Sequence, residues 1–362
     1  MTTSKGNTRR FLIINPFGIG DVLFTTPVLK GIKEKYPESF IGYWCNQRVG
    51  ALLKTNPYLD AVIDLNRGDL KRIFKESPLA GIKKLFSLIG ALKKYKFDTC
   101  IDYSLDYRYS LIAKLMNIKQ RIGYNFKRKR GFFTRSLDIE GYNEKHMVEY
   151  YIDLARESGI EIMDKRMSLE INKESRQNID SLLLNHGIGP DEAVIGIVPG
   201  AGQSWGKDAY IKHWPAEKFA ELADRIIDQF NIKVIIVASR EEKDITSGVL
   251  SCMRNKALDI TGIVSLTDLP ALLKRCRVLV TNDGGPLHIA VALDIRTVSI
   301  FGPVSEVVYG PYPKNDEHIV LKRQLDCRPC YKDFKLAHCV HSKECIDSIQ
   351  VDQVFDAVRR LM

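Results

Sequence analysis

Residues 281–303 read TNDGGPLHIAVALDIRTVSIFGP, and this stretch decides the predicted fold. The apolar run 278–280 precedes it and has the pattern of a buried strand that ends near Asp283. The pair Gly284-Gly285 then breaks the pattern, and Pro286 begins an apolar segment suited to a packed helix. The stretch therefore predicts a strand, a tight loop and a helix, which together form the repeating unit of a parallel α/β sheet.

The same loop predicts a site for a nucleotide-sugar. Because Gly284-Gly285 has no side chains, a ligand can approach the backbone, and the N–H groups at the helix start attract an anion such as a diphosphate. We expect Asp283 to accept hydrogen bonds from sugar hydroxyls and His288, about one turn into the helix, to donate to a phosphate oxygen. The alternative is an ordinary glycine-rich turn with His288 on the helix surface, since short glycine motifs are weak signals.

Length and composition indicate a globular chain of two domains. The chain has 362 residues, of which 45% are hydrophobic and 27% are charged. No run approaches the roughly 20 apolar residues that span a bilayer, and residues 1–10 hold no long apolar segment, so we expect a cytoplasmic protein. The net charge of +10 favours an anionic partner: a nucleotide, a nucleic acid or an acidic membrane surface. Nucleic acid is not expected, because no zinc-finger spacing or interleaved aromatic and basic motif occurs.

Strand-like apolar runs alternate with helical stretches along most of the chain. A first set of strands is expected at 11–15, 40–45, 61–65, 97–103 and 121–124, and a second set begins at 193–198, after a polar segment with a break at 186–190. Such alternation predicts two Rossmann-like domains with parallel, helix-covered sheets. The carboxyl ends of both sets of strands are expected to face one central cleft, which is the GT-B arrangement.

Several motifs occur in a specific order. They are GIGDVLFTTPVLKGIKEKYP at 18–37, NPYLDAVIDL at 56–65, RIGY at 121–124, KHWP at 212–215 and NDGGPLHIAVALDIRTVSIFGP at 282–303. Over nearly its whole length the chain resembles glycosyltransferase family 9, the ADP-heptose:lipopolysaccharide heptosyltransferases. The resemblance implies an inverting, metal-independent transfer of heptose from ADP-heptose to a lipid-anchored lipopolysaccharide core saccharide, with peripheral contact at the inner membrane surface. The alternatives are another nucleotide-sugar, or a non-catalytic protein that binds nucleotide-sugar or nucleic acid.

The resemblance also implies a domain plan. Residues 1–175 are expected to form the acceptor-binding domain and residues 190–345 the donor-binding domain. Residues 346–362 are expected to form a helix that packs back on the first domain. In the first domain, Gly18 and Gly20 of the glycine-rich loop and the basic run that starts with Lys127 and Arg128 and continues to residue 130 are candidates to bind the acceptor. A charge run is otherwise a solvated face of the protein.

Two residues are the candidates for catalysis. Asp21 matches the family's general base, and its position at the end of a glycine-rich loop is also typical of a helix N-cap, which favours an ionised carboxylate. Lys212 resembles the lysine that neutralises the donor phosphate, with Lys207 as a second candidate and a surface lysine as the alternative. Together with His288 and the helix start, Lys212 is expected to supply the positive charge that makes a metal unnecessary.

Two further residues are assigned to the donor. Gly200, after the strand at 193–198, would let the sugar or diphosphate approach closely. Glu242 follows a strand at the position where nucleotide-binding sheets place an acid on the ribose hydroxyls. An acidic residue in a first helical turn explains Glu242 equally well, because it opposes the helix dipole.

The chain has eight cysteines. We expect four scattered ones to be buried apolar residues: Cys45, Cys100, Cys252 and Cys276. The others form a late cluster with the spacing Cys327-x2-Cys330-x8-Cys339-x5-Cys345. This spacing is compatible with a structural zinc, in which His338 or His341 could replace a thiolate, and the alternatives are reduced thiols or a local disulfide.

Overall fold

The computed structural model describes residues 8–64, 72, 75–128, 131–202 and 205–362. The chain divides into two compact units, residues 1–140 with 147–165 and residues 141–146 with 166–362. The division after Lys165 falls earlier than the expected boundary. The polar helix α8 (Lys173–Asn185) therefore belongs to the second unit, where it contacts α11 (Leu269–Lys274).

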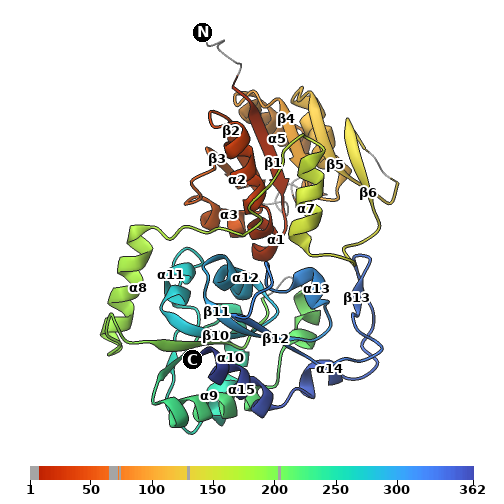
Figure 1. Cartoon of the computed structure of the whole chain (residues 1–362). Coiled ribbons are helices and arrows are strands. Elements are labelled where there is room, and N and C mark those ends of the chain that lie inside the picture. The colour runs from red at the N-terminus through yellow and green to blue at the C-terminus, as the bar shows by residue number, and fades with distance from the viewer. Residues whose placement is uncertain (1–7, 65–71, 73–74, 129–130, 203–204) are drawn as a thin grey trace. The chain divides into compact units, whose positions relative to one another are not determined.

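The first unit contains a parallel sheet of six strands in the order β3-β2-β1-β4-β5-β6 (Figure 1). Its strands are β1 (Arg10–Asn15), β2 (Phe40–Cys45), β3 (Ala61–Asp64), β4 (Thr99–Asp102), β5 (Gln120–Phe126) and β6 (Arg135–Ile139). This is the strand order of a dinucleotide-binding fold, in which the order reverses between β1 and β4. The sequence pattern missed β6, because an edge strand that reads RSLDI has no run of apolar residues.

The helices of the first unit are α1 (Ile19–Phe24), α2 (Thr26–Lys35), α3 (Gln47–Leu53), α5 (Pro78–Lys93), α6 (Tyr107–Leu115) and α7 (Met147–Arg156). The helical segment after the glycine-rich loop consists of two helices, α1 and α2, with a break at Thr25. The Thr25 hydroxyl donates to the Val22 carbonyl at 2.6 Å and lies 2.7 Å from the Tyr43 hydroxyl. A buried threonine that bonds to the preceding turn competes with the helical backbone, which favours a break at this residue.

The second unit repeats the architecture, with a parallel sheet in the order β12-β11-β10-β7-β8-β9. Its strands are β7 (Val194–Val198), β8 (Lys233–Ile236), β9 (Leu258–Asp259), β10 (Cys276–Asn282), β11 (Arg296–Phe301) and β12 (His318–Lys322), beside a hairpin of β13 (Tyr331–Lys332) and β14 (Lys335–Leu336). Besides α8 and α11, its helices are η1 (Gly206–Lys212), α9 (Ala216–Phe230), η2 (Arg240–Glu242), α10 (Lys243–Cys252), α12 (Gly285–Ala292), α13 (Glu306–Tyr309), α14 (Glu344–Asp347) and α15 (Val351–Leu361).

The terminal helix α15 packs within the second unit. It contacts α9 and the strands β10, β11 and β12. Val354 and Val358 are fully buried in this core, and Phe355 stacks on Phe230 with ring centroids 5.7 Å apart. Full burial of a valine side chain contributes about 2 kcal/mol, so this apolar face holds the helix firmly in place. By its contacts α15 belongs to the second unit, and its expected return to the first domain stays a prediction.

The positions of the loops follow from the two sheets. In a parallel sheet all strand carboxyl ends lie at one edge, and ligands of open α/β sheets bind at that edge, where the strand order reverses. In the first unit this point lies between β1 and β4, and in the second between β7 and β10. Among the helices of the described residues, none combines the length and the hydropathy that a membrane crossing needs.

Candidate functional site

The loops at the carboxyl edge of the second sheet are joined by Asn282, the last residue of β10. The Asn282 amide donates to the carbonyl of Pro199 at 2.7 Å and to that of Gly200 at 3.4 Å. The Asn282 side-chain oxygen accepts from the backbone N–H of Trp214 at 3.2 Å. The loop after β7, the segment before α9 and the β10–α12 junction are therefore held together by one buried side chain.

The loop after β7 has no room for a side chain at Gly200. A Cβ placed there would lie 2.1 Å from Oε1 of Glu242. The Glu242 carboxylate accepts from the backbone N–H of Gly202 at 2.9 Å and from the backbone N–H and hydroxyl of Ser239 at 3.1 and 2.9 Å. Glu242 thus caps the start of its own helix, which agrees with the alternative of an acidic residue in a first helical turn. It also bonds to the loop that follows β7. Its predicted bond to a ribose remains a proposal.

The strand, loop and helix predicted from residues 281–303 are present. Strand β10 ends at Asn282 and helix α12 begins at Gly285. At Gly284 the backbone is extended, and a Cβ there would lie 3.0 Å from the carbonyl oxygen of Ala201. A larger residue at position 284 would push against the loop after β7, which packs closely there. The two loops thus lie against each other beside the start of α12.

Lys212 is fixed at this junction. Its ammonium group forms an ion pair with the carboxylate of Asp283 and lies 4.6 Å from the centre of the Trp205 ring. Both charged residues are buried, with 9% of Lys212 and 5% of Asp283 exposed. The neighbouring Trp214 anchors the segment, because its ring is buried and its indole N–H donates to the carbonyl of Ile349 at 3.0 Å. Lys212 is therefore a buried cation with two partners and not a surface lysine.

Two histidines at this edge are uncharged at neutral pH. Burial lowers the pKa of His288 to about 4. Asp283 acts to raise this pKa, and Lys212 acts to lower it. Burial likewise lowers the pKa of His213, against the influence of Glu242. The expectation that His288 adds positive charge is therefore wrong for the free protein. A neutral imidazole still has one N–H group to donate to a phosphate oxygen.

His213 was not among the predicted site residues. Its Nε2 atom is buried and has no hydrogen-bond partner within the part of the chain that the structure describes. Its backbone carbonyl accepts from the ammonium of Lys343 at 3.2 Å. The sequence signal was its position beside Lys212 in the KHWP motif, and the ring atom is a further candidate to contact a ligand.

In the first unit, Asp21 lies at the carboxyl edge of the sheet, in the short helix α1 that follows β1. It is the third residue of α1 and not the N-cap, which is Gly18. The Asp21 carboxylate accepts from the backbone N–H of Gly18 at 3.2 Å and from the hydroxyl of Tyr151 at 3.2 Å. The Asn15 amide donates to the Asp21 carbonyl at 3.0 Å. Gly20 lies within the same turn, so the glycine-rich loop and Asp21 form one unit of structure.

Asp102 is a second acid at this edge, and sequence reasoning missed it. It ends β4, paired with Ile14 of β1, and only 1% of it is exposed. Its Oδ1 accepts from the backbone N–H of Ser104 at 2.8 Å, whereas Oδ2 has no partner among the described residues. Burial raises the pKa of Asp102 to about 7, against the hydrogen bonds from Ser104. Its signal was an acid at the end of a predicted apolar strand.

The predicted acceptor residues Lys127 and Arg128 form an exposed turn after β5. Both have left-handed backbone angles, with φ of 54° and 55°, and the Lys127 ammonium lies 5.1 Å from the centre of the Phe126 ring. Residues 129 and 130, which complete the basic run, lie outside the described residues. The turn presents positive charge to solvent and has no observed partner that assigns it a role.

The late cysteines come close to one another without forming a metal site. Burial raises the pKa of Cys345 to about 11, and the other three thiols of the cluster raise it further, which places them nearby. The Cys339 sulfur accepts from the backbone N–H of Lys343 at 3.3 Å. Within the described ranges, however, no group of three or more His, Cys, Asp or Glu residues is arranged to hold a metal ion. The structure therefore does not show a zinc site here, and the structural zinc stays a prediction.

All eight cysteines are free, so the alternative of a local disulfide is not realised. Of the four scattered cysteines, Cys45, Cys100 and Cys276 are buried as predicted. Cys252 is exposed, and the prediction was wrong there because the residue lies at the end of α10, on the solvent side.

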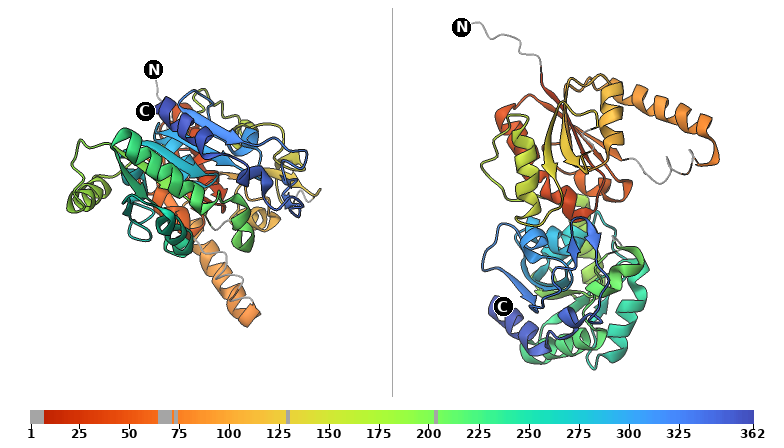
Figure 2. Two further views of the ribbon diagram at one scale, coloured as in Figure 1. Left: turned by 90° about the horizontal axis from the view of Figure 1, so that it is seen from below. Right: turned by 90° about the vertical axis from the view of Figure 1, so that its right-hand side faces the viewer.

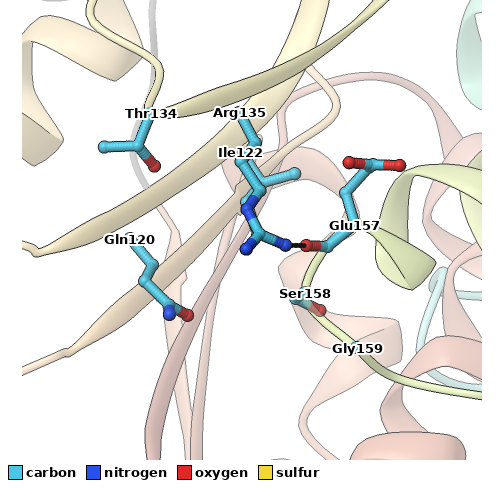
Figure 3. Close-up of a pocket in the computed structure, with 7 residues that line it drawn as sticks. All are labelled: Gln120, Ile122, Thr134, Arg135, Glu157, Ser158 and Gly159. Carbon is cyan, nitrogen blue, oxygen red and sulfur yellow. Dashed lines mark hydrogen bonds between the residues drawn. The ribbon is translucent and has the colours of Figure 1, made fainter.

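A small cavity of about 140 Å³ lies at the opposite edge of the first sheet (Figure 3). It is bounded by the first residues of β5 and β6 and by the end of α7, where the Arg135 guanidinium donates to the Glu157 carbonyl at 2.7 Å. This bond caps the carboxyl end of a helix, which is a structural use of arginine. None of the predicted site residues lines this cavity.

Comparison with known proteins places this geometry in a family. The family model described as "Glycosyltransferase family 9 (heptosyltransferase)" matches residues 85–341. The chain belongs to glycosyltransferase family 9. The family-9 chain is 26% identical over 351 residues to a lipooligosaccharide heptosyltransferase 2 of Campylobacter jejuni, covering 96% of this chain and 97% of that one.

Two solved structures share the fold of this family-9 glycosyltransferase. One is a glycosyl transferase family 9 protein of Veillonella parvula, with a TM-score of 0.80 and 24% identity over 98% of this chain and 97% of that chain. The other is the ADP-heptose lps heptosyltransferase II of E. coli, with a TM-score of 0.77 and 20% identity over 97% and 98% of the two chains. The predicted fold class and the predicted family are therefore confirmed.

Proposed function

We propose that this family-9 glycosyltransferase transfers heptose from ADP-heptose to a saccharide of the lipopolysaccharide core, with inversion at the sugar carbon. The names of its relatives support the sugar and the acceptor. The main support for donor binding is the buried ammonium group of Lys212, which lies beside the glycine loop and the start of α12.

The donor diphosphate binds at the start of α12 in this proposal. Backbone N–H groups at a helix start attract an anion, and Lys212 adds a fixed positive charge that stabilises the departing diphosphate. His288 and His213 donate neutral hydrogen bonds. Asp283, which lies against Lys212, accepts from sugar hydroxyls, and Glu242 accepts from the ribose. Gly200 and Gly284-Gly285 lie in the loops of the donor site in this proposal, where Gly200 and Gly284 allow the neighbouring groups to pack closely.

Asp21 is the general base. It takes the proton from the acceptor hydroxyl as that oxygen forms a bond to the anomeric carbon, while the bond from this carbon to the diphosphate breaks and ADP leaves with the electron pair. A single displacement inverts the anomeric configuration and needs only one base. The hydrogen bond from Tyr151 supports this role because it fixes the direction of the carboxylate.

The acceptor is a lipid-anchored saccharide whose phosphates bind Lys127 and Arg128, near a loop formed by Gly18 and Gly20. Exposed basic side chains suit an acceptor of this charge. Because nucleotide-sugars are used inside the cell, the enzyme acts in the cytoplasm, at the inner surface of the membrane.

Catalysis requires no cofactor in this proposal. A structural zinc at Cys327, Cys330, Cys339 and Cys345 is a separate part of the proposal, supported by the mutual proximity of the thiols and the N–H···S contact at Cys339. Metal analysis of the purified protein distinguishes zinc from reduced thiols, because a zinc site contains about one metal per chain and its removal lowers stability.

The deciding experiment is a panel of nucleotide-sugars, each tested first for thermal stabilisation and then for transfer to a core saccharide. Binding to the native state raises apparent stability, so the true donor gives the largest shift. We expect ADP-heptose to give both the shift and the product. A larger thermal shift with another nucleotide-sugar would show that ADP-heptose is not the donor. A thermal shift without any transfer product would show that the protein binds nucleotide-sugars without catalysing transfer.

A further inference from the structure

Helix α5 of the first unit has two different halves. Its carboxyl-terminal half packs on the sheet, where Ile89 and Leu92 are each 3% exposed within the core. Its amino-terminal half projects from the body of this unit, as the orange helix in both views of Figure 2 shows. The exposed fractions there are 81% for Leu79, 45% for Ile82 and 63% for Phe86.

These exposed residues form one stripe. Their spacing of three and four residues places Leu79, Ile82 and Phe86 on one side of the helix, and the buried Ile89, three residues after Phe86, continues this stripe toward the sheet. A soluble surface seldom exposes three large apolar side chains together, and a contiguous patch of this kind marks a site of interaction. The apolar stripe is therefore buried at Ile89 and exposed over the amino-terminal half of the helix, where the described residues of the first unit do not cover it.

The charge around the stripe identifies the partner. Residues 78–96 contain five lysines and no acidic residue. Lys83 and Lys84 are exposed in the amino-terminal half of the helix, and Lys93, Lys94 and Lys96 are exposed at the other end of the segment. Lysine side chains can extend from an apolar surface toward anionic headgroups, so apolar residues and lysines on one helix suit a membrane interface.

We propose that α5 binds the surface of a bilayer that contains anionic lipids, with Leu79, Ile82 and Phe86 inserted at the boundary between headgroups and acyl chains. The 16-residue helix lies in the interface and does not cross it. The inference rests on the proposed function in one respect, which is that the acceptor is anchored in this same surface. Binding through α5 would then raise the local concentration of enzyme around its acceptor.

The test is co-sedimentation of the full-length protein with vesicles of phosphatidylethanolamine, with or without phosphatidylglycerol. We expect sedimentation with the anionic vesicles that weakens in high salt. Phe86→Asp should weaken it about tenfold or more, because the change removes an inserted ring and adds a repelled charge. Met163→Asp is the matched control, since Met163 is 87% exposed in the same unit but outside α5, and it should bind like the wild type.

Two readouts keep this inference separate from the proposed function. Transfer to a water-soluble acceptor fragment should be unchanged by Phe86→Asp, and the thermal unfolding of the variant should match the wild type. Vesicle binding that is equal for Phe86→Asp and wild type would overturn the role of α5 without touching the proposed reaction. A change of oligomeric state on Phe86→Asp, with no vesicle binding by the wild type, would instead assign the stripe to a second copy of the chain.

Discussion

The ammonium of Lys212 lies against the carboxylate of Asp283, at the point where β10 ends and α12 begins. The two residues are 71 positions apart in the sequence, and both are buried. Lys212, the cation proposed for the donor site, is thus balanced by an acid in the free protein. A diphosphate at the start of α12 would compete with Asp283 for the same ammonium group, which makes the strength of this pair a determinant of donor affinity.

Replacement of Lys212 should weaken donor binding. We expect Lys212→Met to lower the affinity for ADP by about 10- to 100-fold, because a charge-assisted contact in a buried site is lost. Isothermal titration calorimetry measures this change. Lys207→Met is the matched control, since Lys207 is an exposed lysine in the same short helix. An affinity of Lys212→Met equal to that of the wild type would remove Lys212 from the donor site.

Replacement of its partner should have the opposite effect on affinity. Asp283→Asn leaves the Lys212 ammonium without a counter-charge, so ADP should bind more tightly while the free protein loses about 3 kcal/mol of stability. Calorimetry and denaturant unfolding give the two quantities. Weaker ADP binding in this variant would show that the Asp283 carboxylate holds Lys212 in place and does not compete with the ligand.

Asp21→Asn should abolish transfer without affecting the donor. The amide keeps the shape of the carboxylate but cannot accept the acceptor's proton, so kcat should fall by about 10²- to 10⁴-fold with an unchanged ADP affinity. Tyr151→Phe should lower kcat less, because it removes only the hydrogen bond that orients Asp21. Turnover of Asp21→Asn at the wild-type rate would exclude Asp21 as the base.

Chelation should leave the initial rate of transfer unchanged. In the proposed reaction, Lys212 and the N–H groups at the start of α12 stabilise the departing diphosphate, so no metal takes part. Rates measured in excess EDTA and in excess magnesium should agree. A loss of rate that magnesium alone restores would show that a metal, and not Lys212, balances the charge of the leaving group.

Asp102 should make stability depend on pH. The pKa of an unfolded aspartate is near 3.8 and that of buried Asp102 is about 7, so between these values the folded chain holds a proton that the unfolded chain has released. The contribution of Asp102 is therefore most favourable below the lower pKa and is lost as the pH rises through the higher one. Asp102→Asn should be more stable than the wild type by about 2–4 kcal/mol at pH 8 and nearly equal to it at pH 4.

Denaturant unfolding at several pH values measures this difference, and Asp98→Asn serves as a comparison because Asp98 is a half-buried acid just before the first residue of the same strand. A stability difference that does not change between pH 4 and pH 8 would mean that Asp102 is ionised in the folded protein throughout this range.

Local features of the sequence determined most of the architecture. The alternation of apolar runs with helical stretches predicted two parallel sheets, because the spacing of apolar residues that distinguishes a strand from a helix is visible within a short stretch of sequence. The glycine pair and Pro286 predicted the β10–α12 junction because their effects are also local. Glycine allows backbone angles that other residues avoid, and proline fixes its own φ near the helical value. Where the pattern was weak or interrupted, as in the half-polar strand β6 and at Thr25, prediction missed the element or the break.

Contacts between distant residues were decided only by the tertiary structure. The bond from Tyr151 to Asp21, the pairing of Lys212 with Asp283 and the packing of α15 in the second core join segments that no local pattern relates. Burial set the charge states in the same way. The fold removes His288 and Asp102 from water, which lowers the pKa of the histidine and raises the pKa of the aspartate. The sequence thus identified the candidate residues of the site, whereas the tertiary structure determined their hydrogen-bond partners and their charges.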